Sequence, residues 1–259
     1  MILNNDNYFS PEASMEYFGV SQLKSFDKCE AMALAECKGE YKQEMSTALL
    51  VGSYVDAYFE GTLLEFENAH PELFKKDGSL KADYVHANKI IKRIHKDPLF
   101  MEYMAGEKQV IKTGEIDGFP FKIKIDSYHP GRMIVDLKVM RSLERIAGRS
   151  FVDYWKYFWQ AFVYKEVEGN NLPFYLAATT KEDEPDLAIV QLEEADIREA
   201  GEYIRKKLPR WAAIKRGETE PERCEQCNFC KRTKLLKEPI SSDFIGFTPK
   251  EIRMMKGEY

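Results

Sequence analysis

Acidic and basic side chains near the middle of the chain have a spacing suited to metal-assisted chemistry. Asp136 and Lys138 are two residues apart in an alternating apolar and polar segment, so on a strand they project from one face. Asp126 lies on the polar side of the preceding segment, and Gly131, in a Pro130-Gly131 turn, is midway between the two acids. A hairpin with this register brings both carboxylates and the ammonium together at one end of a sheet.

Two carboxylates this close repel each other unless a positive charge lies between them. Mg²⁺ is usually held by one or two carboxylates and keeps waters for substrate phosphates. Lys138 beside such an ion can hold and polarise an attacking water, which is the equipment for phosphodiester hydrolysis. The alternative is a surface hairpin with a charged outer face, because a D-x-K triplet is common by chance.

Two predicted helices supply further candidates. Asp56 follows Gly52 by four residues in an apolar stretch, where an unpaired buried carboxylate is costly, and it is a candidate third metal ligand. Its alternative is an acid on a partly exposed helix surface. Gln160 and Tyr164 are one helical turn apart and can reach the same pocket, or form an interfacial pair that satisfies its own hydrogen bonds.

The elements that must position these residues follow from hydrophobic periodicity and turn signals. Helices are predicted over residues 21–39, capped by Ser21, then over 46–61 and over 82–104 with an interruption at Pro98. Strands are predicted over residues 108–113, 119–128, 132–140, 173–180 and 187–192, with an aromatic helix over 151–169 and a long helix over 193–216. This order predicts an α/β sandwich with a mixed sheet.

The length of 259 residues allows one large domain or two small ones. No internal repeat or low-complexity linker divides the chain, so we expect a single domain over residues 1–259. Its core spans about 46–192, with an N-terminal helical region over 1–45 and a C-terminal helix and Cys-rich segment over 193–259 packed onto it.

Composition excludes several classes of protein. With 44% hydrophobic and 31% charged residues, the chain is neither disordered nor collagen-like. The net charge of -5 gives no overall attraction to a polyanion, although residues 205–237 carry eleven Lys and Arg against four acids. No apolar run approaches about 20 residues and the start lacks the order of a signal peptide, so we expect a cytoplasmic protein without membrane contact.

Five cysteines, an odd number in a chain without an export signal, argue against a disulfide framework. Cys29 lies near the start, and Cys224, Cys227 and Cys230 form a C-x-x-C-x-x-C segment near the end. Cys37 is expected to be an ordinary helix residue.

Four motifs occur in one order along the chain: Gly52-Ser-Tyr-Val-Asp56, Asp126, Asp136-Leu-Lys138 and Gln160-Ala-Phe-Val-Tyr164. Together they resemble the PD-(D/E)XK nuclease superfamily, in particular its RecB-like and RecE-like exonuclease branches. The resemblance covers residues 20–237 and implies a βββαβ core with a central mixed sheet flanked by helices.

The resemblance also implies roles for residues. Asp126 and Asp136 bind the metal, the carbonyl of Leu137 completes its shell, and Lys138 activates the water. Gln160 and Tyr164 arrange DNA or water beside them. Asp56 stands where many relatives have His, which keeps a metal ligand possible. An additional acid found in relatives corresponds to Glu107 or Glu115, or is replaced by Gln109.

The implied function is a Mg²⁺- or Mn²⁺-dependent deoxyribonuclease. Relatives of this kind are exonucleases on linear double-stranded DNA ends in phage or prophage recombination, with a single-strand annealing recombinase as partner, acting in the bacterial cytoplasm as rings. We therefore expect self-association. The alternative is a non-catalytic DNA-binding or scaffold protein that retains the fold, and the intact acids and lysine argue against it.

Some RecB-like nucleases hold a [4Fe-4S] cluster with one cysteine before the nuclease core and three after it. By resemblance, Cys29, Cys224, Cys227 and Cys230 are the four ligands, although the second gap is shorter here than in that family. A four-thiolate site can instead hold Zn²⁺, and reduced cysteines without metal are the remaining alternative.

Overall fold

The computed structural model of the protein describes residues 1–236 and 239–257. Lys237, the last residue of the predicted basic stretch, and residues 258–259 of the predicted domain lie outside them. The chain divides into two compact units, one of Met1–Gln43, Ile116–Phe121 and Glu202–Tyr259, the other of Glu44–Glu115 and Lys122–Gly201. The single domain expected from the sequence stays a prediction.

A five-stranded mixed sheet is formed by β1 (Glu107–Ile116), β2 (Phe119–His129), β3 (Met133–Met140), β4 (Phe174–Thr180) and β5 (Leu187–Gln191). The strands lie in sequence order across the sheet. β3 pairs antiparallel with β2 and parallel with β4, and β4 pairs antiparallel with β5. The parallel pair requires a helical crossover between β3 and β4. The predicted α/β fold with a mixed sheet is therefore confirmed.

The hairpin of β2 and β3 has the predicted register. Ser127 lies opposite Val135, so the next positions along the strands bring Asp126 beside Asp136. Gly131 in the turn has φ 70°, in the left-handed region that glycine adopts without a steric penalty. The local turn thus sets the relation between the two acids.

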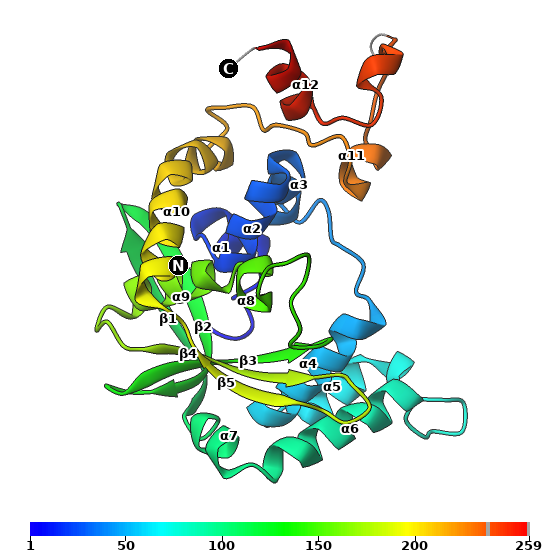
Figure 1. Cartoon of the computed structure of the whole chain (residues 1–259), viewed down its shortest axis with the longest axis vertical. Helices are drawn as coiled ribbons and strands as arrows, with labels where there is room; N and C mark the ends of the chain where they lie inside the picture. The colour runs from blue at the N-terminus through cyan, green and yellow to red at the C-terminus, as the bar shows by residue number, and fades with distance from the viewer. Residues whose placement is uncertain (237–238, 258–259) are drawn as a thin grey trace. The chain divides into compact units, whose positions relative to one another are not determined.

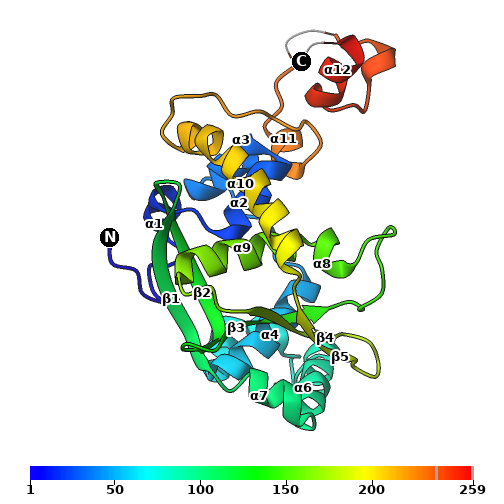
Figure 2. The same cartoon turned by 60° about the vertical axis from the view of Figure 1, so that its left-hand side comes forward.

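Within the unit that contains Asp136, helices cover both faces of the β-sheet, as Figures 1 and 2 show. On one face lie α4 (Thr47–Glu60), α6 (Ala82–His95) and α7 (Pro98–Tyr103), and on the other lies α9 (Tyr157–Glu168). The short α5 (Leu63–Ala69) and η1 (Pro71–Leu73) connect α4 to α6. Tyr54, Ile90, Ile94, Val135 and Leu137 belong to one buried cluster that joins helices to sheet.

Helix ends in this unit follow from their capping residues. The Ser46 side chain accepts from the Leu49 N–H to begin α4, and Gly61 ends it with φ 81°. The Asp97 side chain caps α7, and Pro98 occupies its first turn. The predicted helix bounds at residues 46–61 and the interruption at Pro98 are confirmed.

The aromatic segment predicted as one helix over residues 151–169 is two helices in the structure. α8 (Phe151–Tyr154) ends at Trp155, and Lys156 adopts φ 54° before α9 begins at Tyr157. A left-handed residue cannot continue a right-handed helix, so the single-helix prediction is wrong at this point. Gly169 ends α9 as predicted, with φ 85°.

The other unit contains α1 (Pro11–Glu16), α2 (Val20–Lys28), α3 (Glu30–Cys37), most of α10 (Glu194–Lys215), α11 (Asn228–Arg232), η2 (Ser242–Phe244) and α12 (Pro249–Lys256). α1, α11, η2 and α12 were not predicted. Phe26 stacks on Trp211, with ring centroids 6.0 Å apart, and both side chains are buried. This aromatic pair holds α2 against α10 inside the unit.

The helix predicted over residues 21–39 is also divided. Cys29 has φ -164° and ψ 107°, so its extended backbone ends α2 and begins α3. Gly19, rather than the predicted Ser21, precedes the first turn of α2. Extended backbone cannot be part of a helix, so the prediction of one continuous helix is wrong.

Within residues 1–236 and 239–257, no helix combines the length and the apolar character needed to cross a bilayer.

Candidate active site and thiol centre

The hairpin of β2 and β3 holds the two predicted carboxylates in a buried setting. Asp136 is only 2% exposed. The backbone N–H of Leu137 donates to Oδ2 of Asp126 at 2.9 Å, which fixes that carboxylate across the strand pair. Gln109 from β1 donates to Oδ1 of Asp126 at 3.2 Å. The structure therefore brings Asp126 and Asp136 together, as the spacing predicts.

Lys138 lies against the same carboxylates. Its Nζ forms an ion pair with Oδ2 of Asp136 and donates to the carbonyl of Leu137 at 3.3 Å. Burial works to lower the pKa of Lys138, but the charges of Asp136 and Asp126 outweigh burial and raise that pKa above its ordinary value. Lys138 is therefore a permanent cation near neutral pH.

Asp56 on α4 is the third acid of the site. Its buried Oδ1 accepts no hydrogen bond, which is costly for a carboxylate oxygen. Burial raises the pKa of Asp56 well above its ordinary value, and the charge of Asp126 raises it further. Burial, together with the charge of Asp136, also raises the pKa of Asp126 to about 7. Three acids around one lysine leave an excess of negative charge.

The donor types at this site, carboxylate and carbonyl oxygens, are those that a hard divalent cation prefers. The oxygen ligands would be the carboxylates of Asp56, Asp126 and Asp136 and the carbonyl of Leu137. The partnerless Oδ1 of Asp56 and the raised pKa values of two acids are the features that a bound cation would relieve. The site thus has the chemistry expected of a Mg²⁺ or Mn²⁺ centre.

The two predicted residues of α9 have different surroundings. Nε2 of Gln160 donates to Oδ1 of Asp136, and the side chain is buried. The hydroxyl of Tyr164 instead donates to the carbonyl of Lys124 on β2 at 2.8 Å. Gln160 is therefore joined to the carboxylates, while Tyr164 anchors α9 to β2. Their roles in arranging DNA or water stay predictions.

Sequence reasoning missed Tyr157. The Nζ of Lys138 lies 5.4 Å from the centroid of the Tyr157 ring. The Tyr157 hydroxyl donates to Sδ of Met140 at 3.4 Å. Burial raises the pKa of Tyr157 to about 12, opposed by the charge of Lys138, so the phenol is neutral. Its position three residues before Gln160, on the same helix, was the signal that could have identified it.

The three candidates for the position of the additional acid differ in their surroundings. Of the three candidates, Gln109 donates to Asp126, whereas Glu107 and Glu115 are exposed. Gln109 adopts φ 53°, an unusual backbone conformation for a residue other than glycine. An amide at this position adds a donor beside the acids rather than a further negative charge.

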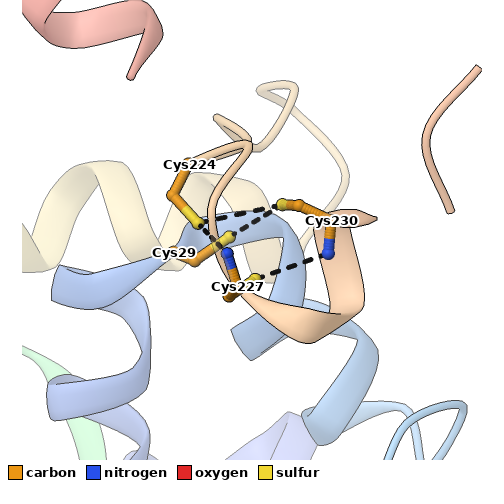
Figure 3. Close-up of side chains that lie close together, drawn as sticks. All are labelled: Cys29, Cys224, Cys227 and Cys230. Carbon is orange, nitrogen blue, oxygen red and sulfur yellow. Dashed lines mark hydrogen bonds between the residues drawn. The ribbon is translucent and has the colours of Figure 1, made fainter. Parts of the chain in front are cut away.

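A second centre lies in the other unit, where four cysteines converge (Figure 3). The sulfur atoms of Cys29, Cys224, Cys227 and Cys230 all lie within 4.8 Å of one another. Within residues 1–236 and 239–257, no other group of three or more His, Cys, Asp or Glu residues brings its ligand atoms together in this way. None of the five cysteines forms a disulfide, and Cys37 is a buried residue at the end of α3. The predicted convergence of one early and three late cysteines is therefore present.

The thiol groups of the quartet differ in pKa. Burial raises the pKa of Cys29. Burial also works against ionisation of Cys224, but the backbone N–H groups of Gln226 and Cys227 outweigh it and lower the pKa of Cys224 to about 7. A quartet with one easily ionised thiol is suited to take up a metal cation.

The mixed sheet flanked by helices, with Asp126, Asp136 and Lys138 on its central hairpin, defines the PD-(D/E)XK class of nuclease. The family described as "PDDEXK-like domain of unknown function (DUF3799)" matches residues 19–233. The chain belongs to this family.

A crystal structure from Eubacterium rectale, of a protein named "Putative exonuclease", is 44% identical to this chain. It covers 95% of this chain and 99% of its own, with a TM-score of 0.91. The crystal structure of SSO0001 is 16% identical over 85% of this chain and 96% of its own, with a TM-score of only 0.33. No curated protein sequence matches the chain significantly.

Proposed function

We propose that the protein is a Mg²⁺- or Mn²⁺-dependent deoxyribonuclease that degrades linear double-stranded DNA from its ends. The observation that carries the proposal is the set of buried Asp136 and half-buried Asp56 and Asp126 beside Lys138. A decayed, non-catalytic relative has no reason to keep this costly arrangement of charge. The name of the 44% identical protein from Eubacterium rectale is consistent with an exonuclease.

Each residue of the site has a distinct task in hydrolysis. Asp56, Asp126 and Asp136 would hold a divalent cation, which would supply positive charge for the reaction and lower the pKa of water. Lys138 orients that water and stabilises negative charge as it develops. Gln160 holds Asp136 in place through its amide, and the ring of Tyr157 lies beside the ammonium of Lys138.

Exposed side chains in the segment after β3 are of the types that bind nucleic acids. Between residues 141 and 155, three exposed arginines are followed by an exposed aromatic pair: Arg141, Arg145, Arg149, Tyr154 and Trp155. Guanidinium groups bind phosphates and aromatic rings stack on bases. Because this segment follows directly from the strand that carries Asp136 and Lys138, we propose that it contacts DNA beside the cleavage site. The exposed rings suit the terminal base pair of a duplex end.

A place in phage or prophage recombination, with a single-strand annealing recombinase as partner and a ring-shaped oligomer, is proposed only from the family resemblance. Solution mass measurement tests the oligomer, and a strict monomer at working concentrations would contradict the ring. The iron–sulfur assignment of the cysteines is likewise a prediction from resemblance.

The decisive experiment compares linear, nicked and closed circular duplexes, labelled at each end, in Mg²⁺, in Mn²⁺ and in EDTA. We expect release of nucleotides from linear DNA only, with no reaction in EDTA, and an inactive Asp136→Asn variant as the matched control. Cutting of closed circles would indicate an endonuclease. Tight DNA binding without cleavage in any metal would instead favour the scaffold alternative.

A further inference from the structure

The sulfur spacing in the cysteine quartet identifies the kind of metal centre that it can form. A single zinc ion with Zn–S bonds of about 2.3 Å in a tetrahedron holds its four sulfurs about 3.8 Å apart. Here the sulfurs of Cys29 and Cys230 are 3.5 Å apart, those of Cys224 and Cys230 are 3.9 Å apart, and all four lie within 4.8 Å. The quartet therefore has the dimensions of a site for one ion.

The [4Fe-4S] cluster that the resemblance implies does not fit this spacing. In such a cluster each thiolate binds a different iron, so the four sulfurs stand outside the whole cage and farther apart than around one ion. We infer that Cys29, Cys224, Cys227 and Cys230 bind a single zinc ion in a closed structural site.

The backbone around the sulfurs is arranged to support thiolates. The N–H of Cys227 donates to Sγ of Cys224 at 3.3 Å, and the N–H of Cys230 donates to Sγ of Cys227 at 3.4 Å, as the dashed lines in Figure 3 show. Glu225, with φ 58°, provides the tight bend between the first two of these cysteines. Such donors stabilise negative sulfur and orient the ligands around a metal.

A cationic side chain, shared with one carboxylate, also lies beside the quartet. Four thiolates with one Zn²⁺ carry a net charge of -2, which needs positive partners in a half-buried site. The guanidinium of Arg223 donates to the carbonyl of Cys230 at 2.8 Å and pairs with Glu225 at 2.7 Å. The chain thus places a cation and two N–H donors against the ligand set.

The expected role is to hold α11 on the junction of α2 and α3. The apolar contacts there are few: Ala31 and Met32 are buried, with Tyr41 and Phe229 partly buried against them. α11 has only five residues, and Leu235 and Leu236 beyond it are each 84% exposed. Because such a small core cannot hold a five-residue helix, the ion would supply most of the attachment.

Metal analysis of the full chain tests the inference directly. Protein purified anaerobically without chelators should be colourless and contain one zinc per chain, without iron or inorganic sulfide. Replacement of the zinc by Co²⁺ should give the visible absorption of a tetrahedral tetrathiolate site. Brown protein with iron and sulfide would overturn the inference, and so would protein without bound metal.

A pair of cysteine variants gives a matched control. Cys227→Ser should lose the zinc and lower the melting temperature by about 10 °C, as expected for loss of several interactions in a chain of this size. Cys37→Ala, which changes the buried cysteine outside the quartet, should keep one zinc per chain. Unchanged zinc content and melting temperature in Cys227→Ser would refute the site.

The outcome is separable from the nuclease proposal. Asp136→Asn should keep one zinc per chain, because Asp136 lies outside the quartet. A catalytically inactive wild-type protein with stoichiometric zinc would refute the nuclease and leave the zinc site standing.

Discussion

The carboxylate centre and the thiol quartet both concentrate negative charge, but they balance it differently. At the carboxylates the chain supplies its own compensation, with Lys138 paired to Asp136 and Gln160 donating to the same side chain. The four thiols contact one another, backbone N–H groups donate to their sulfurs, and an arginine lies nearby. We therefore expect the carboxylate centre to keep its fold when a cation is lost or exchanged, and the proposed ion of the quartet to contribute to the stability of its unit.

The two centres also differ in how the chain assembles them. The acids and Lys138 come from neighbouring strands and one helix of a single unit, between residues 56 and 138. The quartet joins Cys29 to cysteines about 200 residues later in sequence. We therefore expect changes at the carboxylates to alter catalysis with little loss of stability, and changes at the thiols to do the reverse.

The largest expected effect is on cleavage by Asp136→Asn. The variant changes a proposed metal ligand and removes the ionic partner of Lys138 but keeps the size of the side chain, so we expect loss of several kcal/mol of transition-state stabilisation. We expect cleavage of linear duplex to fall by about 10³-fold or more, with DNA binding retained in a gel-shift assay. Cleavage within tenfold of wild type would refute the assigned chemistry.

Gln160→Ala should have a smaller effect on the same reaction. It removes the amide that holds Asp136, and loss of such an outer partner costs about 10–100-fold in metal affinity or activity. Titration of the cleavage rate with Mg²⁺ should show a raised metal requirement. A change in DNA affinity alone, with the Mg²⁺ dependence unaltered, would mean that Gln160 contacts substrate instead.

Asp126→Asn should change how stability depends on pH in the absence of metal. Burial and Asp136 raise the folded-state pKa of Asp126 to about 7, so folding takes up a proton between about pH 4 and pH 7. This group therefore makes the folded state less stable as pH rises through that range. We expect Asp126→Asn to be more stable than wild type at pH 8 by up to about 4 kcal/mol, because the pKa shift of about three units is worth about 1.4 kcal/mol per unit.

Denaturant titrations at pH 5 and pH 8 in EDTA provide the measurement. The difference in unfolding free energy between variant and wild type should shrink toward pH 4, where Asp126 is protonated in the folded state and about half protonated in the unfolded state. A difference that is constant with pH would show that Asp126 does not titrate in this range. In the wild type, Mg²⁺ should stabilise more at pH 8 than at pH 5, because a cation competes with the proton for the carboxylate.

Tyr164→Phe should produce the smallest change. It removes one hydrogen bond to the carbonyl of Lys124, worth about 1 kcal/mol of unfolding free energy. Cleavage should stay within about threefold of wild type if the hydroxyl only anchors α9. A loss of cleavage comparable to that of Gln160→Ala, at unchanged stability, would assign Tyr164 to the reaction itself.

Local signals in the sequence determined most of the active-site hairpin. Alternating polarity placed Asp136 and Lys138 on one face of a strand, and the turn at Gly131 set the register that brings Asp126 beside Asp136. These relations involve residues within a dozen positions of one another, so backbone geometry alone decides them. The spacing of the four motifs likewise carried the family resemblance that the match over residues 19–233 bears out.

The tertiary structure alone decided where continuous helical patterns are interrupted. Residues 21–39 and 151–169 have helix-forming composition, yet Cys29 is extended and Lys156 is left-handed. A residue in the left-handed conformation costs about 1 kcal/mol or more. Such a break in a helix therefore persists only where packing or ligand contacts elsewhere offset this cost. No local pattern reports those distant contacts.

The spacing of the four sulfurs was equally beyond the sequence. One early and three late cysteines predicted convergence, but a cluster, a single ion and unliganded thiols all agree with that order. Only the folded chain shows distances of 3.5 and 3.9 Å between sulfurs. Sequence therefore determined which residues meet, through local periodicity and motif order, while packing of distant segments decided how closely they meet and hence which metal they suit.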